Sequence, residues 1–167
     1  MRLGCKATRR AHVPVVLVSI QFIIDVVLIH VQVFSMPIVL VSLVDRERQW
    51  FKSVVGLPGA TETSRETSFC AWTLLPQDPE CLVVNDARND ARFRNNPLVT
   101  GAPHIQFYAG CPLVSSAGQR LGSLCAIDTR TRYFTSEDCN LLCNLAEMVV
   151  RELEVRDAQV CLKEKYY

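Results

Sequence analysis

Residues 96–113 read NPLVTGAPHIQFYAGCPL, and this stretch decides the fold. Two prolines and a glycine among its first eight residues predict a loop, because both residue types interrupt helices and strands. Aromatic and β-branched residues at 105–108 then predict a strand. A loop that leads directly into an aromatic strand is typical of the wall of a small-molecule pocket.

Two predicted hairpins surround this stretch. Residues 38–44 are apolar at successive positions, which predicts a central strand covered on both faces, and residues 49–55 return beside it after a polar turn. Segments 107–114 and 121–127 predict a second hairpin around a polar loop, and residues 82–84 add a short strand. We therefore expect an antiparallel sheet.

Three helices are predicted beside the sheet. Residues 68–75 begin at a capping serine and stop before a proline, which indicates a short helix. Asp86 is expected to cap another short helix over residues 87–93. Thr135 and Asp138 have the spacing of a capping box, which predicts the start of the last helix.

The last helix carries more apolar surface than one sheet face can cover. Residues 141–150 are apolar around most of the circumference, so a second helix or a second chain could cover the remainder. We therefore expect a weak homodimer through this apolar half, with Val149 and Leu153 in the contact. The stripe Leu142, Ala146, Val149 and Leu153 keeps heptad spacing, but Arg156 breaks it before Val160.

Five further segments occur in an order that resembles the GAF family of ligand-sensing domains. They are VSLVD (41–45), QWFKS (49–53), ETSFC (66–70), LVVNDAR (82–88) and RLGSLCAID (120–128).

This resemblance covers roughly residues 31–155, with an atypical hydrophobic segment at 1–30 and a helix extension at 156–167. It implies an α/β (α+β) fold: a central antiparallel sheet with helices on one face, and short helices and loops roofing a pocket on the other. It also implies a non-catalytic, small-molecule-sensing domain of a signal-transduction protein related to histidine-kinase phosphorelays or cyclases. Ligand state would pass through the terminal helix to an output domain.

The pocket is expected between the sheet and the layer formed by residues 68–75 and 95–106. Those segments are short and broken by prolines, so they can roof a concave site but cannot pack as long helices. Alternation along the strand allows only one of two neighbouring aromatic residues to face the pocket, and Tyr108 is favoured over Phe107. The expected lining is Phe69, Trp72, Phe93, Phe107 or Tyr108, and Leu113.

Two positions depart from the sequences that this chain resembles. Trp72 stands where His is common; its ring could cap a ligand or simply anchor the short helix in the core. Gln106 stands where Arg is common, and a neutral amide cannot clamp a carboxylate or phosphate. The ligand and any cofactor are therefore left unidentified.

No catalytic or metal site is expected. The chain has eight cysteines but no CxxC pair, its three histidines lie far from the cysteine pairs in sequence, and no nucleophile elbow or phosphate-binding glycine loop occurs. Cys111 and Cys125 lie on the two strands of one hairpin, which leaves a pocket-thiol reductase of methionine sulfoxide as an alternative. A dimerisation module without a ligand is the other alternative.

Charge and hydropathy bear on partners and location. A net charge of +1 gives no pull toward nucleic acid, and the cysteine usage indicates a reducing, cytoplasmic compartment. Residues 13–34 form an apolar run after four basic residues, as in a membrane signal-anchor. Asp25 at its centre opposes insertion by roughly 2.5–3.5 kcal/mol. A helix over 22–34 packed on the sheet and a non-native leader are the alternatives.

Overall fold

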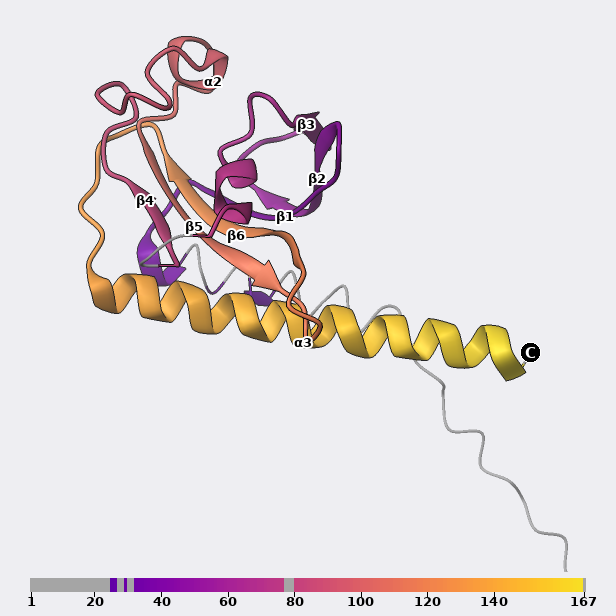
Figure 1. Ribbon diagram of the computed structural model, residues 1–167. Helices are drawn as coiled ribbons and strands as arrows, with labels where there is room; N and C mark the ends of the chain where they lie inside the picture. Colours follow the sequence, from indigo (N-terminus) through magenta and orange to yellow (C-terminus); the bar gives the residue numbers. More distant parts are fainter. Residues whose placement is uncertain (1–24, 27–28, 30–31, 77–79, 167) are drawn as a thin grey trace, which may run out of the picture.

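The computed structural model describes residues 25–26, 29, 32–76 and 80–166. A six-stranded antiparallel sheet in the order β3-β2-β1-β6-β5-β4 forms its centre (Figure 1). The strands are β1 (Ile38–Val44), β2 (Arg48–Val55), β3 (Glu62–Ser64), β4 (Leu82–Val84), β5 (Phe107–Val114) and β6 (Arg120–Asp128). The expected antiparallel α+β sheet is confirmed, and β3 is a strand that the sequence analysis did not predict.

Strand β1 lies inside the sheet, between β2 and β6, and is buried on both faces. Val39 and Val41 point into one hydrophobic cluster, whereas Ile38 and Leu40 point into the other. Each fully buried aliphatic side chain of this kind contributes roughly 1.5–3 kcal/mol to the free energy of unfolding. The unbroken apolar run of β1 thus gives the sheet two cores, one on each side.

One face of the sheet packs against the long helix α3 (Ser136–Tyr166), seen below the strands in Figure 1. The helix begins at the predicted capping box. The backbone N–H of Thr135 donates to Oδ2 of Asp138 at 2.9 Å, and the N–H of Asp138 donates to Oγ1 of Thr135 at 3.1 Å. Such caps are worth about 1 kcal/mol each.

The other face is covered by short elements: η1 (Cys70–Leu74), α2 (Pro97–Thr100) and the loops around them. Asn96 joins two of these segments, because Oδ1 accepts from the N–H of Leu98 at 2.9 Å and Nδ2 donates to the carbonyl of Thr67 at 3.0 Å. This layer is held together by loop hydrogen bonds and by the second hydrophobic cluster.

The helix predicted over residues 87–93 is wrong; the chain forms turns there. Asp86 accepts from the N–H of Arg88 at 3.1 Å, and Asp90 accepts from the N–H of Arg92 at 2.8 Å. Each aspartate closes its own local turn, which competes with a continuous helix.

Before β1, residues 25, 26, 29 and 32–34 are helical. Val26 and Phe34 are buried in the same cluster as α3, whereas Asp25 is exposed. Most of the apolar run 13–34, including everything up to residue 24, lies outside the described residues. Among those that are described, no helix is long and apolar enough to cross a bilayer.

Candidate functional site

A small cavity of about 50 Å³ lies between the sheet and the layer of η1 and α2. Its walls are almost entirely apolar, with polar groups contributed by Gln49, Thr63, Cys70 and Tyr108. Ligand pockets for drug-sized molecules usually measure 300–1,000 Å³. The described side chains therefore leave room for only a few atoms. The lining residues are Leu40, Gln49, Phe51, Leu57, Thr63, Phe69, Cys70, Leu98, Pro103, Ile105, Tyr108 and Ile127.

Three of the six residues expected at this pocket meet around it. Phe69 and Tyr108 line the cavity, with ring centroids 5.2 Å apart. Phe93 is fully buried behind Phe69 and stacks on it, so it supports the wall without lining it. Tyr108 rather than Phe107 faces this side of the sheet.

Leu113 does not line the cavity, and that part of the prediction is wrong; Phe107, the less favoured of the two neighbouring aromatic residues, also lies on the other face. Both side chains are buried in the cluster under α3, on the opposite face of β5. Side chains alternate along a strand, so positions 107, 109, 111 and 113 all face α3 once Tyr108 faces the cavity.

Trp72 does not line the cavity either, contrary to the prediction. Its side chain is 38% exposed, contacts Phe93 edge-on, and borders a separate open hollow beside Arg65. The cause is the 3-10 helix, in which residues three apart share a face. Cys70 and Thr73 occupy its buried face, so residue 72 points outward.

A buried hydrogen-bond network beside the cavity was not anticipated. Oε1 of Gln49 accepts from the hydroxyls of Ser68 and Thr63, and Nε2 of Gln49 donates to Sγ of Cys70 at 3.1 Å. The hydroxyl of Tyr108 donates to the same sulfur at 3.3 Å. One feature of the sequence could have indicated this network, namely a polar residue inside an apolar strand. Ser42 is such a residue, and it is fully buried near the network.

A second thiol completes the network. Sγ of Cys125 lies 3.5 Å from Sγ of Cys70, and both side chains are buried. Burial by itself raises the pKa of Cys70, but hydrogen bonds from Cys125, Ser42, Tyr108 and Ser123 outweigh it and lower that pKa to about 7. Burial, and then the neighbouring Cys70, raise the pKa values of Cys125 and Tyr108.

The suggested proximity of Cys111 and Cys125 is wrong. Cys111 pairs with Leu124 in the hairpin register, so Cys111 and Cys125 point to opposite faces of the sheet. Cys111 forms a disulfide with Cys143 of α3, with Cα atoms 5.3 Å apart. The thiol that meets Cys125 is Cys70, which is distant in sequence and on a different element.

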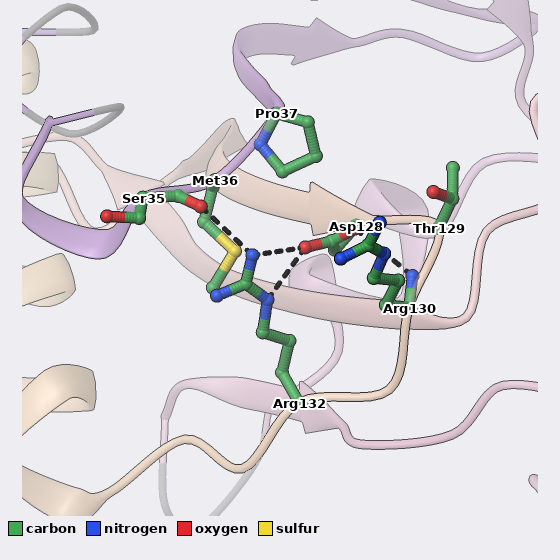
Figure 2. A pocket seen from close by; sticks show the side chains of 7 residues that line it. All are labelled: Ser35, Met36, Pro37, Asp128, Thr129, Arg130 and Arg132. Atoms are coloured by element: carbon green, nitrogen blue, oxygen red, sulfur yellow. Dashed lines mark hydrogen bonds and ion pairs between the residues drawn. The ribbon is translucent and has the colours of Figure 1, made fainter.

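A larger, open hollow of about 380 Å³ lies where the chain enters β1 and leaves β6. Figure 2 shows the guanidinium of Arg132 between Asp128 and Ser35. Nε of Arg132 donates to Oδ2 of Asp128 at 2.7 Å, and its terminal nitrogen donates to the carbonyl of Ser35 at 3.0 Å. Because Asp128 neutralises the charge of Arg132, we interpret the contacts of Arg132 beside this hollow as a structural clamp. They hold the segment that enters β1 against the loop that leaves β6.

The predicted dimer contact needs a correction. Val149 is completely buried against the sheet, and Leu153 is partly buried against the same cluster. Among the side chains of α3 whose burial is described, up to residue 155, the exposed large apolar ones are Leu141, Met148 and Val155, at 38%, 43% and 52% exposure. They are seven residues apart, whereas the predicted stripe is the one that faces the sheet.

Among the described residues, no group of three metal-ligating side chains is present.

Comparison with known proteins supplies a family. The family model named GAF domain matches residues 15–153. A curated relative, a cyclic di-GMP phosphodiesterase of Pseudomonas aeruginosa, is 43% identical over 121 residues, which is 72% of this chain and 20% of that protein. The chain thus spans about a fifth of the relative's length.

Solved structures of low identity share the fold. A GAF region of a putative membrane protein from Geobacter sulfurreducens superimposes with a TM-score of 0.66 at 18% identity, covering 84% of this chain and 95% of that one. A domain of a putative two-component sensor histidine kinase from Sinorhizobium meliloti gives 0.63 at 13%, covering 86% and 95%. A free methionine-R-sulfoxide reductase from Neisseria meningitidis gives 0.67 at 18%, covering 84% and 81%. At these identities the likeness concerns the fold alone.

Proposed function

The chain belongs to the GAF domain family, and on this premise we propose that it is a non-catalytic regulatory module of a longer signalling protein that degrades cyclic di-GMP. The phosphodiesterase is the favoured output because that relative is 43% identical, whereas the histidine-kinase domain shares 13%. We assign hydrolysis to another region of that longer protein, because the match covers only 20% of the phosphodiesterase. A histidine-kinase or cyclase output is the less favoured assignment.

The observation that carries this proposal is the geometry of α3. The helix is continuous from Ser136 to Tyr166, and Figure 1 shows that it extends well past the edge of the sheet. Its first part is anchored to the sheet by Leu142, Ala146 and Val149. A helix anchored to a domain in its first part and extending beyond the sheet is suited to pass a change in the domain to a neighbouring region.

The exposed apolar surface of α3 favours dimerisation as the event that passes a change in the domain to the neighbouring region. Leu141, Met148 and Val155 form one exposed stripe along α3, and Ile29 and Val33 are exposed in the helical segment before β1. A seven-residue repeat on a helix places its members on one side, as at a helix–helix contact. We propose that a second copy of the chain covers this stripe.

A ligand-sensing role is the second candidate, and the apolar cavity beside Tyr108 is its support. A volume of about 50 Å³ restricts a bound signal to a molecule of a few atoms while the layer of η1 and α2 stays closed. A reductase of free methionine sulfoxide is not supported, because that substrate exceeds the cavity and Cys111 and Cys125 lie on opposite faces.

Sedimentation velocity tests the dimer. Met148→Lys should shift the chain toward monomer, because a buried lysine in the contact must be desolvated. Asn140→Lys adds the same charge at an exposed position about a quarter-turn round the helix and should leave association unchanged. A wild-type chain that stays monomeric at high micromolar concentration would overturn the dimeric mechanism.

A further inference from the structure

The buried network around Cys70 aims hydrogen-bond donors at one sulfur. Oε1 of Gln49 already accepts two hydroxyls, so its amide N–H groups are turned toward Cys70. The Tyr108 hydroxyl donates from another side at 3.3 Å. Donors to a buried sulfur favour the thiolate over the thiol, since the charged form is the stronger acceptor.

A second sulfur stands within reach of the first. The two Sγ atoms of Cys70 and Cys125 are 3.5 Å apart, and a disulfide bond measures about 2.05 Å. An approach of about 1.5 Å would join them. The two residues come from η1 and β6, so the bond would tie the covering layer to the sheet.

The cavity provides access to Cys70 for small molecules only. Cys70 is one of its lining residues, and its volume of about 50 Å³ admits a molecule of water or peroxide size. Bulky oxidants such as glutathione disulfide do not fit. The site therefore combines an activated sulfur, a neighbouring thiol and a size filter.

We propose that Cys70 and Cys125 form an oxidation site for hydrogen peroxide. The thiolate of Cys70 attacks one peroxide oxygen; the O–O bond breaks, hydroxide leaves and takes up a proton, and Cys70 becomes a sulfenic acid. The sulfur of Cys125 then attacks the sulfur of Cys70, the S–O bond breaks, and the departing hydroxide takes the thiol proton of Cys125 and leaves as a second water. Two thiols are oxidised to one disulfide while one peroxide is reduced to two waters.

This site goes beyond the proposed regulatory function, because it depends on neither the dimer nor the output region. The lowered pKa of Cys70, about 7, leaves a large fraction of that side chain ionised at neutral pH. An ordinary cysteine with a pKa of about 8.5 is only a few per cent ionised there, so Cys70 should react about tenfold faster than such a thiol.

Peptide mapping of the full chain tests the proposal. The protein is reduced, freed of reductant, treated with hydrogen peroxide, alkylated and digested with trypsin. Cys70 lies in peptide 66–88 and Cys125 in peptide 121–130, whereas the Cys111–Cys143 bond joins peptides 95–120 and 133–151. Because peptide 66–88 also contains Cys81, the experiment is run in the Cys81→Ser background as well as in wild type.

The expected result is a cross-link between peptides 66–88 and 121–130 in both proteins, formed about tenfold faster at pH 7 than the same peroxide oxidises free cysteine. Cys125→Ser should abolish the cross-link and leave Cys70 as a sulfenic acid, which is trapped by unfolding the peroxide-treated protein in the presence of dimedone, because dimedone is too large for the cavity. Near-UV circular dichroism checks that this variant is folded. If Cys70, oxidised in the folded wild-type chain and alkylated after unfolding, is still a free thiol once free cysteine in the same buffer has been oxidised, the proposal is overturned. The wild-type measurement decides the question even if the variant does not fold.

Discussion

Phe69 stacks on Phe93 with ring centroids 4.1 Å apart and ring planes 9° from parallel. This contact joins the residue before η1 to the turns that follow β4, so two segments of the covering layer meet through one aromatic pair. Because Phe69 also lines the cavity, Phe93 fixes the position of a cavity wall without touching the cavity.

Phe93→Ala should lower the free energy of unfolding by about 3–5 kcal/mol, because Phe93 is completely buried and its removal leaves a void behind Phe69. Urea denaturation followed by circular dichroism measures this loss. Trp72→Ala is the matched control, since Trp72 is 38% exposed and should cost clearly less. Equal losses for the two variants would contradict the assignment of Trp72 to the surface.

Gly122→Ala should destabilise the sheet, because a Cβ at this position would lie 1.9 Å from the backbone carbonyl oxygen of Ser42 on β1. Strands β1 and β6 would have to separate locally, at a cost of at least about 1–3 kcal/mol. Gly118→Ala is the comparison: nothing lies within 4 Å of its added Cβ, although its positive φ of 77° adds about 1 kcal/mol of strain. Thermal unfolding of both variants should show the larger drop in Tm for Gly122→Ala.

Arg132→Met should lower the free energy of unfolding by about 2–3 kcal/mol, because it leaves the carboxylate of Asp128, 3% exposed, without its cation. The partial exposure of Arg132 keeps the loss below that of a fully buried pair. Arg130→Met, at an exposed position of the same loop, should change the unfolding midpoint little. A similar effect of both substitutions in urea titrations would argue against the clamp shown in Figure 2.

The rate of Cys70 oxidation should fall as pH is lowered through about 7, the value to which its pKa is depressed. The thiolate is the reactive form, and it is protonated below that pH. The titratable groups that face Cys70 are Cys125 and Tyr108, whose pKa values are both raised, so they stay neutral across this window. Stopped-flow or quenched alkylation between pH 5.5 and 8.5, roughly 1.5 units either side of the midpoint, measures the profile. A flat profile would contradict the thiolate assignment.

Much of the fold was predictable because local chemistry decides it. The apolar run of β1, the hairpin of β5 and β6, and the Thr135–Asp138 capping box were all predicted from residue type and spacing, and all occur. The helix expected over residues 87–93 failed because two aspartates each close a turn, a competition that helix spacing alone does not reveal.

The candidate site was less predictable, because it depends on which face each side chain takes. Alternation placed Phe107 and Tyr108 on opposite faces, but the choice between the faces is made by what packs on each of them. The exposure of Trp72 follows from the three-residue period of η1, which the sequence does not distinguish from an ordinary helical turn.

The sequence by itself determined the family, the antiparallel sheet and the capped terminal helix, since these follow from residue order, short-range spacing and backbone preference. Only the tertiary structure decided that Cys70 meets Cys125 and that Cys111 meets Cys143. Residues 70 and 125 are 55 positions apart, and their contact depends on how η1 docks on β6. Such long-range partners arise from packing against the sheet, for which no local pattern of residues gives the geometry.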